Sequence, residues 1–194
     1  MLDRIKIDGS MHTLFERLSQ LQGCGIEPGH VSETLAPLGD IPPFLRALLV
    51  ADGTVTMALE AYFEEAINIR TIRQGRLDTP TSLPALGVNI GRSVLFREVE
   101  LVGGTTGVCY VHACSVINES AINVSVFEQL VDEHEGIGVV LRNVAKGSFR
   151  EVLDVSRLAV MANGDLSRTY RVSMSSIPAI LITEEFPMQV YTAR

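Results

Sequence analysis

The chain has 194 residues, of which 46% are hydrophobic and 20% charged, a balance that is typical of a globular protein rather than of a disordered segment. Its formal net charge of −7 argues against a nucleic-acid-binding surface, because phosphate binding needs clustered lysine and arginine. It contains no run of about 18 apolar residues and no apolar signal core near its N-terminus, so we expect neither a membrane span nor secretion.

Cysteine usage predicts a reduced, cytoplasmic protein. The three cysteines, Cys24, Cys109 and Cys114, are odd in number and lack a C-x-x-C spacing. This pattern favours small buried thiols over a disulfide framework or a zinc site. The histidines of the expected surface segments show no metal-ligand spacing with one another either, so the sequence predicts no metal centre.

The first 41 residues predict a helical N-terminal extension. A helix is expected over residues 10–21, with Ser10 as its N-cap and its apolar side chains on one face. A second short helix is expected over residues 31–38, and two prolines open a third over residues 42–49. The apolar face of the first helix consists of Met11, Leu14, Phe15, Leu18 and Leu21.

Strand patterns dominate from Ala66 onward. Two predicted strands, residues 93–102 and 108–117, are joined as a hairpin by a glycine-rich connection. Helices are expected over residues 124–133 and near residues 139–144. The other predicted strands cover residues 67–73, 149–160, 168–174 and 179–186.

Early helices followed by hairpin-connected strands predict the α+β class, with a single antiparallel sheet of about six strands covered by helices. The sequence shows no internal repeat and no low-complexity linker. We therefore expect residues 1–194 to form a single domain.

An arginine stands on the apolar face of one predicted strand. In the segment 94–101, Glu98 and Glu100 share one face, while Arg97 shares the other with apolar residues. An arginine among apolar neighbours needs an anion or a route to solvent. From the pattern alone, Arg97 is either a ligand-binding group or one half of a structural ion pair.

The last strand contains a similar anomaly in two adjacent glutamates. Glu184 falls on the face of Ile180 and Ile182, and Glu185 falls on the other face. Only one carboxylate can face the interior, where it becomes a candidate hydrogen-bonding or acid–base group. Alternation alone does not select between them.

Residues in the middle of the second hairpin strand are weaker candidates. His112 lies between Tyr110 and Cys114 and is more typical of a core histidine than of a catalyst. Cys114 is a candidate nucleophile, but no basic residue is tied to it in the sequence.

Several segments together resemble the chorismate lyase family, the chorismate pyruvate-lyases that make 4-hydroxybenzoate. The resemblance covers roughly residues 42–190, which we take as the core, and its motifs are specific through their order and spacing. The matching segments are the leucine-rich helix and D-G-T-x-T turn at 44–56, the strands 95–99 and 113–117, the glycine at 137–138, S-R-T-Y-R-V at 167–172 and L-I-T-E-E-F-P at 181–187.

The resemblance implies an antiparallel sheet with helical flaps over a buried ligand site, and a reaction without metal or organic cofactor. It implies that Arg97 binds the ring carboxylate of the substrate. It also implies that Glu184, rather than Glu185, contacts the ring hydroxyl. Whether Glu184 transfers a proton or only orients the ring is open.

The expected substrate site has further members and one departure from the family pattern. We expect Tyr110, His112, Cys114 and Arg171 to contribute to substrate binding. Cys114 stands where other members carry a charged residue, which predicts a more apolar pocket. The N-terminal extension is also longer than usual, and we consider it as an extra lid or as a homodimer contact.

Two other functions compete with a lyase. One is an enzyme of the same scaffold that cyclises or rearranges a larger apolar metabolite in secondary metabolism. The other is a small-molecule-binding module, since a related fold serves as the effector-sensing domain of some transcription regulators. The sequence has no basic helical segment for DNA, which counts against a regulator, so the expected partner is a small molecule.

Overall fold

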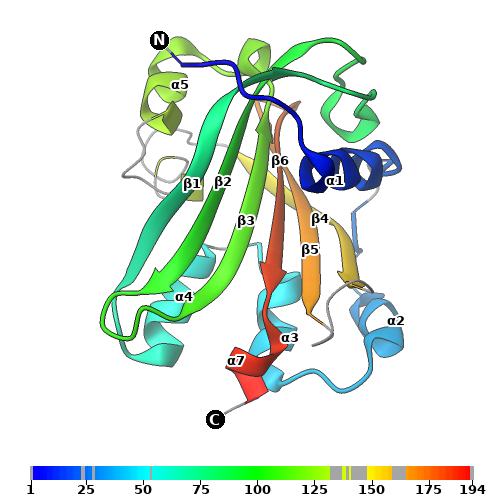
Figure 1. Ribbon diagram of the computed structural model, residues 1–194. Helices are drawn as coiled ribbons and strands as arrows, with labels where there is room; N and C mark the ends of the chain where they lie inside the picture. Colours follow the sequence, from blue (N-terminus) through cyan, green and yellow to red (C-terminus); the bar gives the residue numbers. More distant parts are fainter. Residues whose placement is uncertain are drawn as a thin grey trace.

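A single antiparallel sheet forms the centre of the molecule in the computed structural model (Figure 1). Among the described residues, six strands are ordered β1-β2-β3-β6-β5-β4, which confirms the predicted α+β class. The strands are β1 (Ile67–Asp78), β2 (Ser93–Gly103), β3 (Cys109–Ile117), β4 (Phe149–Arg157), β5 (Leu166–Met174) and β6 (Ile177–Phe186). The structure describes residues 2–22, 25–27, 29–52, 54–131, 137–138, 140, 148–158 and 165–192.

The sheet consists of two three-stranded units joined at its centre. Strands β1, β2 and β3 pair in sequence, as do β4, β5 and β6, and β3 pairs with β6. The β5–β6 turn places Ser175 and Ser176 at φ angles of 50° and 65°, the left-handed backbone that a tight hairpin turn requires. The central pairing brings the two anomalous strands of the sequence, β2 and β6, to either side of β3.

Helices cover both faces of the sheet. Helix α1 lies on one face, and α3, α4 and α5 lie on the other (Figure 1). We call these the α1 face and the α4 face. The helices are α1 (Gly9–Ser19), α2 (Val31–Leu35), α3 (Pro43–Val50), α4 (Val55–Phe63), α5 (Val124–Val131) and α7 (Met188–Thr192), with 3-10 turns η1 (Ala36–Leu38), η2 (Pro84–Leu86) and η3 (Glu119–Ala121).

The predicted helices that the structure describes lie where they were expected, but the N-cap of α1 was wrong and both α4 and α7 were missed. Helix α1 begins after Asp8, whose carboxylate accepts a hydrogen bond from the Met11 N–H at 3.0 Å, so Asp8 rather than Ser10 is the N-cap. Helix α4 was not predicted, although its buried residues Val55, Leu59 and Phe63 recur every four positions. Of the helix expected near residues 139–144 the structure describes only residue 140, which is helical, and the end of the helix expected over 124–133 lies outside the described residues.

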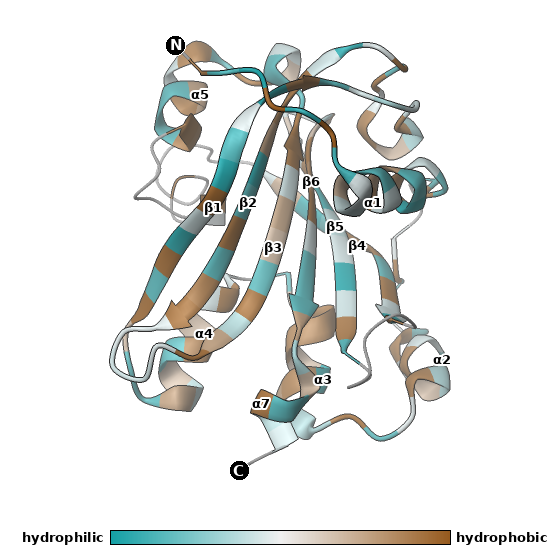
Figure 2. Cartoon of the chain, viewed as in Figure 1, coloured by the Kyte–Doolittle hydropathy of each residue, from teal (hydrophilic) through white to brown (hydrophobic). Residues whose placement is uncertain are grey.

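Three apolar clusters hold the layers together. One packs α3 and α4 against the sheet, and a second packs α5 against the other end of the same face. The third lies under α1, where Met11, Phe15 and Leu18 are buried against β2, β3 and β6. Hydrophilic and hydrophobic bands alternate along β1 and β2 (Figure 2), as expected for a sheet whose two faces have different surroundings. No helix among the described residues is long and apolar enough to cross a membrane.

Candidate active site

A cavity lies on the α4 face of the sheet, between the strands and the start of α4. Its floor is formed by residues of β1, β2, β3, β5 and β6, and Thr54, Ile137 and Arg150 belong to its walls. Among the described residues that line it, three are charged. They are Arg97, Arg150 and Glu184.

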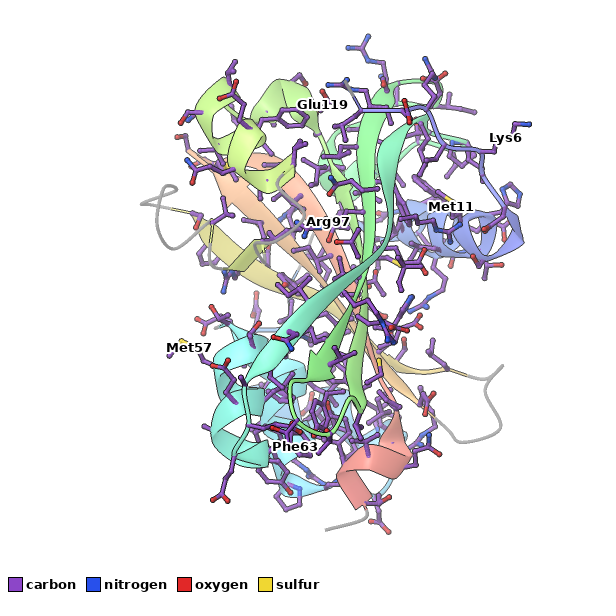
Figure 3. The ribbon with its side chains drawn as sticks, turned by 60° about the vertical axis from the view of Figure 1, so that its left-hand side comes forward. Lys6, Met11, Met57, Phe63, Arg97 and Glu119 are labelled. Carbon is purple, nitrogen blue, oxygen red and sulfur yellow. The ribbon has the colours of Figure 1, made fainter. Side chains whose placement is uncertain are left out.

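Arg97 is a fixed cation in the wall of this cavity. Its side chain is 1% exposed, and its Nη1 donates to the Leu130 carbonyl at the C-terminal end of α5, 3.2 Å away. Gln74, its neighbour on β1, donates to the adjacent Val131 carbonyl at 2.8 Å. A cation at a helix C-terminus is favourable because the last carbonyls carry partial negative charge. Figure 3 shows Arg97 on the side of the sheet that carries α4 and α5, opposite Met11 of α1.

Glu184 faces the same cavity and is paired with a second buried arginine. It is 5% exposed, and its Oε2 accepts from Nε of Arg168 at 2.7 Å. Arg168 lies directly opposite Glu184 in the β5–β6 register. Glu185 points to the α1 face, where its carboxylate lies 3.8 Å from Arg17.

Arg168 connects Glu184 to the helical layer. It is 1% exposed, and its Nη1 donates to the carbonyl of Ala51 at 2.7 Å and to that of Leu48, both at the end of α3. The segment that follows leads to Thr54 in the cavity wall. Arg168 therefore fixes the position of the Glu184 carboxylate relative to the cavity wall.

Tyr170 supplies a hydrogen-bond donor beside Glu184. Its hydroxyl donates to the other carboxylate oxygen, Oε1, at 3.3 Å, and its ring lines the cavity. Burial, with a further contribution from the Glu184 carboxylate, raises the pKa of Tyr170. The phenol therefore keeps its proton and acts as a donor at neutral pH.

Comparison with known proteins places the chain in a family. Residues 49–194, more than half of the chain, match the family described as "Chorismate pyruvate-lyase Rv2949c-like". The chain belongs to this family. A chorismate pyruvate-lyase of Mycobacterium leprae (strain TN) is 29% identical over 159 residues, which cover 76% of this chain and 75% of that protein.

Solved structures share the fold at low sequence identity. The effector domain of PhnF from Mycobacterium smegmatis has a TM-score of 0.55 at 12% identity, over 72% of this chain and 91% of that one. A structure of PhnF from the same organism has a TM-score of 0.56 at 11% identity, over 92% and 94%. At such identities the likeness concerns the fold alone.

The cavity lining described above does not include four of the residues expected in the substrate site, Tyr110, His112, Cys114 and Arg171. Tyr110 packs at the end of the sheet, where its ring stacks on Phe63 with centroids 3.9 Å apart and its hydroxyl donates to Glu65. Arg171 donates to the Ala85 carbonyl at 3.2 Å and also pairs with Glu151. Neither side chain lines the cavity described above.

His112 and Cys114 lie on the α1 face. Their strand neighbours Ala113 and Ser115 line the cavity, and alternation directs the even-numbered side chains of this segment away from it. Cys114 packs beside the cluster under α1. The expectation that Cys114 makes the pocket more apolar is therefore wrong in its geometry, because this side chain is on the other side of the sheet.

Two arginines at the site were missed by sequence reasoning. Arg168 was noted only within a family motif, yet it carries the same signal as Arg97, since it alternates with Tyr170 and Val172 on one face. Arg150 gave no such signal, because it lies on the edge strand β4. It lines the cavity, and its Nη1 donates to the Asp52 carbonyl at 3.1 Å.

Proposed function

We propose that this chain is a chorismate pyruvate-lyase that eliminates pyruvate from chorismate to give 4-hydroxybenzoate, without a cofactor. The observation that carries the proposal is the placement of Arg97 and Glu184 in one largely apolar cavity. Membership of the chorismate pyruvate-lyase family supports the same substrate class. A cytoplasmic location and a homodimer remain predictions.

The proposed reaction requires the protein mainly to position its substrate. Chorismate carries a ring carboxylate, a ring hydroxyl and an enolpyruvyl ether with its own carboxylate. The ring carbon that bears the hydroxyl loses its proton, the ether C–O bond breaks, and the released enolpyruvate takes up a proton to become pyruvate. Because the ring becomes aromatic, the elimination is driven by the substrate itself, and the protein has to orient the ring and exclude water.

The charged groups of the cavity suit the two ends of this ring. Arg97 holds the ring carboxylate through charge-assisted hydrogen bonds, for which a buried and pre-positioned guanidinium is well suited. Glu184 accepts the hydrogen bond of the ring hydroxyl, which brings its carboxylate close to the proton that is lost. Arg168 holds Glu184 in place for this contact.

Arg150 suits the second carboxylate of the substrate. It is the remaining charged residue among the described lining side chains, and it is half-buried at the cavity wall rather than fully enclosed. A cation there stabilises the charge that develops on the departing enolpyruvate. This assignment matches two arginines to two carboxylates.

A small-molecule-binding module is the second candidate. It is favoured by the likeness in fold to the effector domain of PhnF. The two candidates make different predictions for chorismate, since a binding module retains the ligand unchanged.

The deciding experiment incubates the purified full chain with chorismate and follows 4-hydroxybenzoate by chromatography and pyruvate by a lactate dehydrogenase assay. We expect equal amounts of both products, with Arg97→Ala losing turnover. Arg46→Ala, an exposed arginine on α3, is the matched control and should behave as wild type. Tight binding of chorismate without product would favour the binding module and reject the lyase.

A further inference from the structure

A second cluster of polar side chains lies on the α1 face, on the other side of the sheet from the cavity. Glu98, His112 and Cys114 each direct a potential metal-binding atom to one place, and these three atoms lie within 4.8 Å of one another. We call this group the β2–β3 cluster. We propose that it binds a divalent metal ion of the zinc type.

The sheet register brings these three residues together. Cys114 stands directly opposite Glu98 in the β2–β3 pairing, and His112 is two residues away on the same face of β3. His112 Nε2 lies 2.8 Å from Glu98 Oε1. The spacing along the chain gave no sign of a metal site, because one of the three residues comes from the neighbouring strand.

The donor set matches the chemistry of zinc. Zinc binds thiolate sulfur at about 2.3 Å and imidazole nitrogen or carboxylate oxygen at about 2.0–2.2 Å, most often in a tetrahedron. Three protein ligands leave the fourth position for water. In such a tetrahedron neighbouring ligand atoms lie about 3.3–3.6 Å apart. The 2.8 Å separation of His112 Nε2 and Glu98 Oε1 has to open by about half an ångström, and any separation near the 4.8 Å limit has to close by about an ångström, which side-chain rotation can supply.

The surrounding groups would orient the ligands. His112 Nδ1 lies 3.7 Å from Glu185 Oε2, so the ring can donate its second N–H to a carboxylate while Nε2 binds the metal. The second oxygen of Glu98 pairs with Arg73, which leaves Oε1 for the metal. The His112 side chain is 32% exposed and gives an ion a route to the cluster.

Charged groups of the neighbouring elements surround the cluster. The groups that face the cluster are Glu185 on β6, Arg73 on β1, Arg17 on α1 and Asp8 at the start of α1. Arg73 also pairs with Asp8, the N-cap of α1, so a bound metal would reinforce the attachment of the N-terminal helix to the sheet.

Cobalt provides a direct test, because Co²⁺ bound to a thiolate absorbs strongly in the near ultraviolet. The EDTA-treated full chain is titrated with Co²⁺, and Zn²⁺ is then added. We expect thiolate-to-cobalt absorption that saturates near one equivalent, is removed by Zn²⁺, and is absent in both Cys114→Ser and Cys114→Ala. Cys109→Ser is the matched control, since Cys109 is a free cysteine on the same strand outside the cluster, and it should retain the signal.

The residue that orients His112 makes a graded prediction in the same titration. Glu185→Gln should weaken Co²⁺ binding about tenfold to a hundredfold, as is usual for a residue that orients a ligand. Far-UV circular dichroism checks that each variant is folded, and Zn²⁺ should raise the Tm of wild type but not that of Cys114→Ser. Absence of thiolate–cobalt absorption in wild type, or its persistence in Cys114→Ser, would overturn the proposal.

Discussion

Arg168 and Glu184 face each other across the β5–β6 pairing, with 2.7 Å between Arg168 Nε and Glu184 Oε2 and with exposures of only 1% and 5%. A buried pair of this kind contributes little net stability compared with apolar residues of the same volume. Removal of one partner is costly, however, because the other charge is then left buried. The pair therefore supplies a carboxylate of fixed position at the cavity rather than a gain in stability.

This relationship predicts an asymmetry between single and double substitutions. Arg168→Met should lower the free energy of unfolding by about 3–5 kcal/mol, since it leaves the buried Glu184 carboxylate without its charge partner and removes the contacts to the end of α3. Arg168→Met combined with Glu184→Leu should recover part of that loss, yet should have no lyase activity. Urea denaturation gives the stabilities, and the chorismate assay gives the activities. Strictly additive losses of stability would contradict the argument.

Adjacent glutamates on opposite faces provide a matched test of the site. Glu184→Gln should lower kcat with chorismate by about a hundredfold or more, the range expected when a group that accepts a proton or a catalytic hydrogen bond is lost. Glu185→Gln should stay within about twofold of wild type, because its carboxylate lies on the α1 face beside Arg17. Steady-state kinetics on both variants decide the point, and equal losses would remove Glu184 from its assigned role.

Strand alternation predicted the central features of the site from sequence. It marked Arg97 as anomalous, and the structure places this side chain in the cavity wall. Alternation did not choose between Glu184 and Glu185, because each shares a face with apolar residues and the choice depends on which side of the sheet holds the cavity. The pairing of Glu184 with Arg168 could not be predicted either, because it depends on the β5–β6 register, which is set by the turn at Ser175 and Ser176.

The misplaced candidates have a common physical reason. His112 and Cys114 were expected at the site from their place in the middle of this strand and, for Cys114, from the family pattern. Arg97, however, pairs with Ser115, so it is the odd-numbered residues of this stretch that share its face. Helix α4 was overlooked after the turn at Asp52, although Val55 and Leu59 already carried a helical spacing. The first error came from considering one strand without its pairing to β2, and the second from overlooking the helical spacing of the apolar residues after the turn.

Glu65 predicts a specific acid sensitivity at the end of the sheet. The Tyr110 hydroxyl, followed by the Thr106 backbone N–H, lowers the pKa of Glu65 to about 2 from an ordinary 4.5. These bonds stabilise the fold fully above pH 4.5, and the contribution is lost as the pH falls from 4.5 towards 2, because the unfolded chain takes up its proton first. Urea midpoints measured from pH 5 to 2.5 should therefore fall less steeply in Glu65→Gln than in wild type.

Two variants sharpen this test of Glu65. Tyr110→Phe removes the strongest of its hydrogen bonds and should also flatten the pH dependence. Glu64→Gln changes the exposed neighbouring carboxylate and should follow the wild-type curve. Indistinguishable curves for Glu65→Gln and Glu64→Gln would show that these hydrogen bonds do not govern acid stability.

Arg150 tests whether the two arginines of the cavity have different tasks. If it holds the enolpyruvyl carboxylate, Arg150→Gln should raise KM and lower kcat/KM for chorismate by about tenfold to a hundredfold, the loss expected for one charge-assisted contact of about 1.5–3 kcal/mol. Its affinity for 4-hydroxybenzoate should be unchanged, because the product has only the ring carboxylate. Arg97→Gln should weaken the binding of both molecules. Product inhibition constants measured beside kcat and KM separate these outcomes, and equal weakening of substrate and product in Arg150→Gln would place its contact on the ring carboxylate instead.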